Sequence, residues 1–121
     1  MPYDYHIDAA RRVVFTRFHG VVTDDDLAEH VNRLRNDPTF DPSFSQLTDG
    51  NGATKVDVTS DAIRRLVESN PFSKNAKRAG VASRDVAFGL LRMYELLADS
   101  RCGEFRVFRD VNEARAWLGL D

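Results

Sequence analysis

The sequence predicts a single α/β domain over residues 1–121, with a mixed, mostly parallel five-stranded sheet, an N-terminal β-hairpin and four helices, in the order β-β-α-β-α-β-α-β-α. The main observation is the stretch from Arg78 to Leu118, where a short apolar run, a long helical pattern, a second apolar run and a last helix follow one another. A strand, a crossover helix and a further strand form a right-handed unit with parallel strands. The second observation is size, because 121 residues, 42% of them hydrophobic, are enough for one core.

The N-terminal segment predicts the hairpin and the first helix. Tyr3–Ile7 alternates weakly, and Val13–His19 is rich in the β-branched and aromatic residues that strands favour. Thr23 precedes three aspartates, so its hydroxyl can cap a helix whose positive end the carboxylates face. We expect Pro38 to end this helix. Its apolar face consists of Leu27, Val31 and Leu34.

The middle of the chain predicts a third strand and a second helix. Phe44–Asp49 has the composition of a short strand, which we expect to end in the turn-like sequence 50–52. The sequence 59–61 is typical of a helix start, and Asn70-Pro71 is typical of a helix end. A basic loop from Asn70 to Arg78 leads into the fourth strand, and most such loops are merely solvated.

The last third predicts two further helices around a fifth strand, Glu104–Phe108. Ser83 is expected to cap the third helix, and Asp110 the fourth. The third helix carries two adjoining apolar stripes, which consist of Val86, Leu90, Met93 and Leu97 and of Ala87, Leu91, Tyr94 and Ala98. Because this surface is wider than one sheet face needs, either a second chain or the neighbouring helices cover the remainder.

The composition argues against several classes of partner and location. A formal net charge of −2 gives no general attraction to nucleic acid. The longest apolar run is far shorter than the roughly 20 residues of a membrane span, so we expect no membrane insertion. The single cysteine, Cys102, cannot form an internal disulfide, and the N-terminus lacks the pattern of an export signal. We therefore expect a cytoplasmic protein.

No spacing of reactive residues demands a particular chemistry. His6, His19 and His30 lie on three different expected elements, without the short spacings of metal ligands. Cys102 has no flanking base that would make it a nucleophile. Neither a P-loop nor a dinucleotide-binding glycine pattern occurs. We therefore expect no metal, no cofactor and a non-enzymatic role.

Any small ligand is expected at the rim where parallel strands end and helices begin, because unpaired N–H groups point there. The residues expected at this rim are Asp49, Thr59, Ser60, Ser83, Arg84 and Arg109. Two arginines and several hydroxyls would suit a carboxylate or phosphate group. The alternative interpretation is ordinary capping, in which these side chains only help the helices to form.

Two segments of the last third, Phe88–Glu95 and Phe105–Gly119, resemble the small bacterial SpoIIAA-like (STAS/SEC14-type) proteins. The resemblance implies βα units with helices packed on the sheet and, from the anti-sigma-factor antagonists of that fold, a regulatory binding module. It also implies that Ser60, with Thr59 beside it, matches the phosphorylated serine in the antagonists' Asp-Ser-Ser-Gly turn. That turn is absent here, and Asp61 would repel an added phosphate, so a plain helix cap is the alternative.

Together these observations predict a non-enzymatic, cytoplasmic regulatory or protein-interaction module that forms a homodimer. The contact surface would be the edge near the second helix or the wide face of the third. The alternative is a protein that binds a small anionic or lipid-like ligand, or an enzyme, using the strand-end crevice. A deep pocket lined by Tyr and Phe would favour the alternative, and exposed apolar residues on a flat third-helix surface would favour the module.

Overall fold

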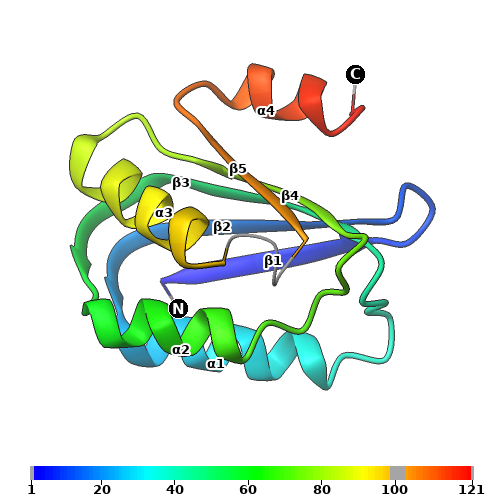
Figure 1. Ribbon diagram of the computed structural model, residues 1–121, viewed down its shortest axis with the longest axis horizontal. Helices are drawn as coiled ribbons and strands as arrows, with labels where there is room; N and C mark the ends of the chain where they lie inside the picture. The colour runs from blue at the N-terminus through cyan, green and yellow to red at the C-terminus, as the bar shows by residue number, and fades with distance from the viewer. Residues whose placement is uncertain (1, 99–102, 121) are drawn as a thin grey trace.

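The computed structural model of the chain describes residues 2–98 and 103–120 (Figure 1). Cys102 lies outside these residues. The strands are β1 (Tyr3–Asp8), β2 (Val13–Thr23), β3 (Ser45–Asp57), β4 (Lys77–Val81) and β5 (Glu104–Phe108). The helices are α1 (Asp24–Arg35), α2 (Ser60–Glu68), α3 (Asp85–Ala98) and α4 (Val111–Trp117). The predicted element order and the α/β fold class are therefore confirmed.

The five strands lie side by side in the order of the chain, β1-β2-β3-β4-β5. β1 and β2 form the predicted antiparallel hairpin, and β2 to β5 pair as parallel neighbours. A helix follows each of the four parallel strands, so all four helices begin at the same end of these strands, toward the left of Figure 1. The predicted gathering of helix starts at a single rim is thus present in the fold.

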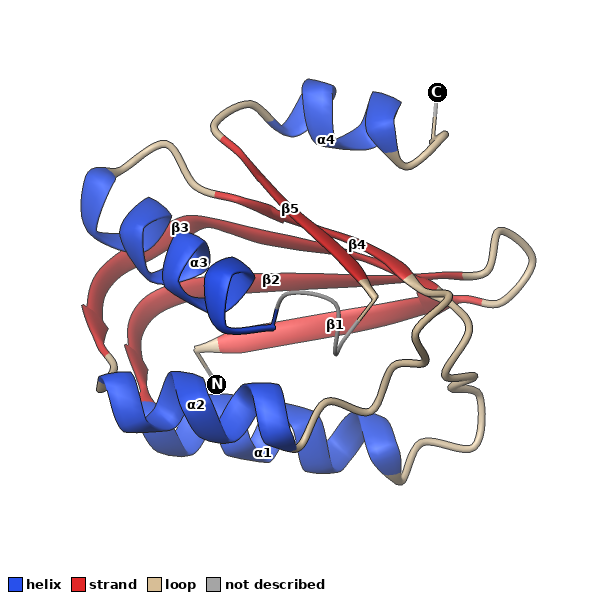
Figure 2. Cartoon of the chain, viewed as in Figure 1, coloured by secondary structure: helices blue, strands red, loops and turns tan. Residues whose placement is uncertain are grey.

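The helices are divided unequally between the two faces of the sheet (Figure 2). α1, α2 and α3 cover one face, and α4 alone covers the other. Alternate residues of the central strands therefore enter different cores, since successive strand side chains point to opposite faces. Leu47, Ala79 and Val81 pack toward α4 around Ala114. Their neighbours Gln46 and Arg78 point to the face covered by three helices.

The third strand is longer than the sequence predicted. β3 continues to Asp57, through the glycine-containing sequence 50–52 that we expected to form a turn. The cause is the partner strand, because β2 also continues to Thr23 and the two pair in parallel along this length. Their register shifts between Arg17 and His19 and again after Gly20. The expectation of a strand end at Asp49 is wrong, because the glycines permit the irregular pairing of β2 with β3 instead of forming a turn.

Two glycines make this irregular pairing sterically possible. Gly20 has a φ of 67°, in the left-handed region that residues with a Cβ rarely adopt. At Gly52 an added Cβ would lie 2.8 Å from the carbonyl oxygen of Phe18 and 3.2 Å from the Cβ of His19. The two strands thus approach each other too closely for any larger residue at position 52.

Local side-chain bonds define the helix starts. At α1, the backbone N–H and the hydroxyl of Thr23 both donate to the Asp26 carboxylate, at 2.8 and 2.9 Å. Thr59 accepts from the N–H of Ala62 at 3.1 Å, and Asp110 accepts from Asn112 at 2.9 Å. In α3 the Phe88 N–H donates to the Arg84 carbonyl, so Arg84 occupies the cap position that we expected for Ser83.

The wide apolar surface of α3 is only partly covered. The stripe that includes Tyr94 and Ala98 faces inward, and these two residues are buried. On the outside, Val86 is 68% exposed, Leu96 69% and Leu97 39%. The neighbouring helices therefore cover one part of this surface and leave another part open. Over the described ranges, no helix has the length and hydropathy needed to cross a membrane.

Candidate functional site

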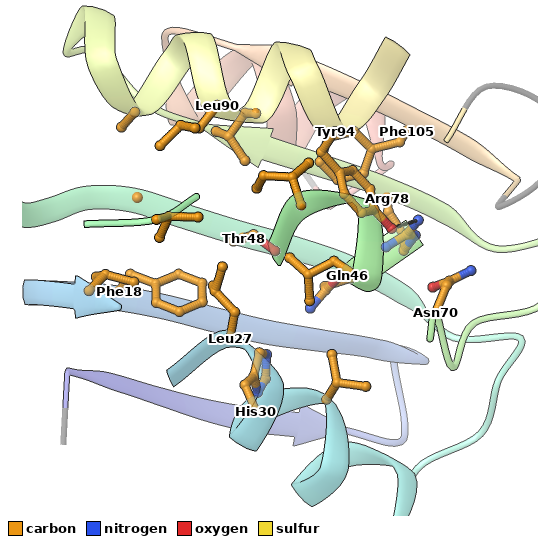
Figure 3. A pocket seen from close by; sticks show the side chains of 18 of the residues that line it. Phe18, Leu27, His30, Gln46, Thr48, Asn70, Arg78, Leu90, Tyr94 and Phe105 are labelled. Atoms are coloured by element: carbon orange, nitrogen blue, oxygen red, sulfur yellow. Dashed lines mark hydrogen bonds between the residues drawn. The ribbon is translucent and has the colours of Figure 1, made fainter. Parts of the chain in front are cut away.

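A cavity of about 160 Å³ lies between the sheet and helices α1, α2 and α3 (Figure 3). Most of its lining is aliphatic or aromatic, with the rings of Phe18, Phe72, Tyr94 and Phe105 among the lining residues. An apolar protein cavity of about 150 Å³ holds a molecule the size of benzene. The space is therefore suited to one ring or a short acyl chain.

Small residues keep this space open. Gly50 and Ala53 on β3 and Ala87 on α3 belong to the lining, although larger side chains normally fill the gap between a sheet and its helices. The loop before β4 contributes Pro71 and Phe72. The cavity thus draws on β2 to β5, three helices and two loops, which places it at the centre of the helix-covered core.

Polar side chains are concentrated at this cavity. The lining residues that can form side-chain hydrogen bonds are His30, Gln46, Thr48, Asn70, Arg78 and Tyr94. Apart from tyrosines, four polar or charged side chains are buried in the part of the chain that the structure describes. Three of them, His30, Gln46 and Arg78, line the cavity. The fourth, Thr16, bonds two of those three. Burying such groups is costly, so their collection around one space distinguishes it from ordinary packing.

The buried polar side chains form a row across the sheet. The Nε2 atom of His30 lies 3.0 Å from the Thr16 hydroxyl, which also accepts a hydrogen bond from Gln46 Nε2 at 3.1 Å. Gln46 on β3 is in turn the register partner of Arg78 on β4. The row therefore runs from α1, through β2 and β3, to a permanent positive charge on β4.

Aromatic rings surround the guanidinium of Arg78. Its central carbon lies 5.1 Å from the ring centre of Phe72, 5.4 Å from Tyr94 and 5.2 Å from Phe105. One of its nitrogens donates to the Tyr94 hydroxyl at 2.9 Å. Rings at these distances attract a cation through their π faces. Figure 3 shows Arg78 beside Tyr94 and Phe105, with Gln46 adjacent.

Asn70 fixes the loop that brings Phe72 to this cation. Its side-chain amide donates to the Phe72 carbonyl at 3.1 Å, and its side-chain oxygen accepts from the Phe72 N–H at 3.2 Å. The two bonds tie the loop to itself just before β4. The Asn70-Pro71 sequence thus ends α2, as predicted, and also places a ring over Arg78.

His30 occupies the other end of the row, among the rings of Tyr3, Tyr5 and Phe18. It is 6% exposed, and its Nδ1 atom has no hydrogen-bond partner within the described residues. Burial lowers the pKa of His30 to about 4, and the nearby positive charge of Arg33 acts in the same direction. The imidazole is therefore neutral at pH 7 and contributes polarity to the cavity without charge.

Four of the six residues predicted at the rim lie together. Arg109 donates to the Ser83 carbonyl and to the Asp85 carboxylate, each at 3.0 Å. The Ser83 N–H donates to Asn51, whose own N–H donates to Asp49. Arg84 donates to the carbonyl of Ala53 on β3 at 2.9 Å. These side chains bond to one another and to the backbone, which stabilises the strand ends.

The other two rim residues belong to a different contact. The N–H and the hydroxyl of Thr59 both donate to Asp24 at the start of α1, each at 2.8 Å. These bonds lower the pKa of the Asp24 carboxyl. Ser60 is exposed at the first position of α2, between Thr59 and Asp61. Anion binding at the rim and phosphorylation of Ser60 stay predictions, and two carboxylates near Ser60 oppose added negative charge.

Sequence reasoning did not identify the cavity residues. The sequence offers His30 as a candidate only for catalysis or metal binding, and no group of three or more potential metal ligands occurs among the described residues. A usable signal was nevertheless present, because Gln46 occupies an inward position of a central strand. Arg78 directly precedes the apolar run of the next strand. Polar residues at core positions of a sheet are unusual unless they have a function.

Comparison with known proteins supports the fold. No protein-family model matches the chain, and no curated protein matches it. Among solved structures it is similar to an uncharacterized protein from the DUF3478 family with a SpoIIAA-like fold, from Shewanella loihica. The two share 16% sequence identity and a TM-score of 0.65, over 96% of this chain and 93% of the other. The predicted SpoIIAA-like fold is thereby confirmed.

Proposed function

From this SpoIIAA-like fold, we propose that the protein binds a small, mainly apolar molecule in the cavity between its sheet and helices α1 to α3. The observation that carries the proposal is the concentration of buried polar side chains, His30, Gln46 and Arg78, around a space lined mostly by carbon. Ligand sites commonly have this character, with apolar walls that provide affinity and a few polar groups that fix orientation.

The energetics of the core support a binding role. Each buried polar group loses its bonds to water, and each unfilled volume loses packing contacts. Larger aliphatic residues at positions such as Ala53 and Ala87 would fill the space and remove the second cost. A bound molecule would restore the missing contacts, and its polar end would meet the polar row. A purely structural core has no need of both features at one place.

The cavity also bears on the two alternatives that the sequence left open. A pocket lined by Tyr and Phe was the feature expected of a small-molecule binder, and Phe18, Phe72, Tyr94 and Phe105 line this one. The location differs from the strand-end crevice that we expected, because the cavity lies under the helices. We therefore favour ligand binding over a role limited to protein contacts.

Titration with toluene tests the proposal. We expect saturable amide and methyl shifts in two-dimensional NMR spectra, concentrated at lining residues such as Phe18, Leu90 and Phe105. The substitution Ala87→Leu should fill the cavity and weaken binding by about 10-fold or more, since a leucine occupies the volume of several methylene groups. Ala116→Leu is the matched control, because Ala116 is exposed on α4 at the opposite face. Shifts that are absent, scattered or unchanged in Ala87→Leu would refute the proposal.

A second candidate function is the cytoplasmic interaction module that the sequence predicted. The observation in its favour is the exposed part of α3, where Val86 and Leu96 are each about two-thirds exposed. Isolated apolar residues are normal on a surface, but several on one helix favour contact with a second copy. Light scattering should then show dimers that Leu96→Glu dissociates and that Val21→Glu, on β2, leaves intact. A monomer at high concentration would contradict this candidate.

A further inference from the structure

We infer that the molecule held in the cavity is a small monocarboxylate, with an apolar body of about six to eight carbons in the cavity and its carboxylate against Arg78. The inference rests on the ligand-binding function proposed above and adds to it the charge and the size of the ligand. The inference is based on Arg78, a buried cation that lies at the end of the polar row and lines a mostly apolar space.

The charge of the lining selects the sign of the ligand. Arg78 is the single formally charged side chain among the lining residues that the structure describes, and it is 4% exposed. His30, the other ionisable base, is neutral at pH 7 for the reason given above. At low local dielectric a fixed cation attracts an anion and repels an ammonium group far more strongly than in water. An anionic end is therefore accepted, and a cationic end is rejected.

The geometry around Arg78 suits a carboxylate. A guanidinium presents several N–H donors in one plane, which match the two oxygens of a carboxylate. The rings of Phe72, Tyr94 and Phe105 restrict the orientation of that plane. Gln46, the register partner of Arg78, places a carboxamide next to it on the same face. A carboxylate at this point would meet a cation whose direction is already set.

The volume sets the size of the apolar body. About 160 Å³ accommodates a single six-membered ring or a comparable short chain, and not a long acyl chain within the protein. The body would lie against aromatic and aliphatic residues such as Phe18, Leu90 and Phe105. Arg78 and Tyr94 border the same space, so one small molecule can fill the volume and reach the cation.

The first test uses the unmodified chain and two matched series of compounds. The ring series is benzoate, benzamide and benzylamine, and the chain series is heptanoate, heptanamide and heptylamine. Calorimetry at neutral pH should give a dissociation constant for the carboxylate about 10-fold or more below that of the amide in at least one series, the size expected of a charged hydrogen bond. The amine should bind most weakly. The series with the higher affinity tells whether the body is a ring or a chain.

The second test uses variants. Arg78→Met keeps an unbranched side chain without charge, and it should remove the preference for the carboxylate while toluene still binds within about 3-fold of its original affinity. Arg64→Met, at an exposed position of α2, should leave every affinity unchanged. Arg109→Met distinguishes the cavity from the rim, because carboxylate binding lost in that variant would place the anion at the strand ends instead.

Three results would overturn the inference. Equal affinity for carboxylate and amide in both series would show that charge is not recognised. A carboxylate preference that survives in Arg78→Met, or disappears only in Arg109→Met, would assign it to another group. If toluene binds in these cases, the ligand-binding function stands and only the choice of carboxylate fails. If neither toluene nor any compound of the two series binds, the proposed function fails with the inference.

Discussion

The buried imidazole of His30 is expected to make folding stability depend on pH. Its pKa is about 4 in the folded protein, against an ordinary value of 6.5 that applies to the unfolded chain. Between these values the unfolded chain binds a proton that the folded protein excludes. The contribution of His30 to folding stability is therefore fully present above about pH 6.5 and decreases as the pH falls toward 4. Below pH 4 this group causes no further change.

The size of the effect follows from the two pKa values. The full difference between them corresponds to a maximal loss of stability of about 3 kcal/mol. The part of this loss that falls between pH 7.5 and pH 5 is about 2 kcal/mol. The physical cause is first the loss of water around a ring packed by Tyr3, Tyr5 and Phe18, and second the positive charge of Arg33. The Thr16 hydroxyl lies 3.0 Å from Nε2 of the ring and is a polar contact of the buried imidazole.

Urea unfolding at these two pH values, followed by circular dichroism, measures the effect. The control is His30→Gln, which retains a polar group near Thr16 and does not titrate. The unmodified protein should lose about 2 kcal/mol more than this variant on going to pH 5. The comparison cancels the contribution of every titratable group that the two proteins share. Acidic groups such as Asp37, whose pKa is lowered by bonds to Thr39 and Tyr5, stay ionised at this pH.

Equal pH dependence in the two proteins, within about 0.5 kcal/mol, would refute the reasoning. So would an NMR titration of the His30 ring with a midpoint near 6.5. Either result would mean that water reaches the imidazole in solution. The polar row would then be solvated at its α1 end, and its burial could no longer support a binding site.

Three further substitutions can be measured by the same urea titration at neutral pH. Gly89→Ala should raise stability by about 1 kcal/mol, because Gly89 lies inside α3 with open space for a Cβ and alanine favours helix. A loss of stability would mean that the added methyl group collides with a neighbour in solution. Gly52→Ala should cost about 2 kcal/mol or more, because its Cβ would collide with the backbone of β2; an unchanged value would contradict the close strand pairing. Tyr94→Phe should cost about 1–3 kcal/mol by removing the acceptor of the Arg78 bond; no cost would show that the bond contributes nothing.

Local patterns were sufficient for the topology. The apolar run that ends in Val81, the helical pattern of α3 and the strand before Phe108 predicted a parallel βαβ unit, which the structure contains. The strand length of β3 could not be obtained in this way. Glycine in a sequence such as 50–52 indicates a turn, but here it permits two strands to approach closely, and only the position of β2 decides between these possibilities.

The candidate site was much harder to predict, because its lining extends from Phe18 to Phe105 along the chain. A cavity has no sequence pattern, since it depends on what several packed elements leave unfilled. His30 is spaced three and four residues from Leu27 and Leu34, which places it on the apolar face of α1. Gln46 follows buried Phe44 by two residues, the spacing at which side chains of an extended chain share one face. Polar residues at these apolar positions can be recognised in the sequence. Only the tertiary structure shows that they line the same cavity.

The cost of this arrangement gives the strongest reason to connect it with binding. An unfilled volume of about 160 Å³ lowers stability by up to about 4 kcal/mol relative to a filled core. That is a large share of the roughly 5–15 kcal/mol that holds a domain of this kind together. A molecule present at about 100 times its dissociation constant would return nearly 3 kcal/mol. The free protein should therefore unfold at a distinctly lower temperature than the ligand-bound one, and a shift that disappears in Ala87→Leu would place the ligand in the cavity.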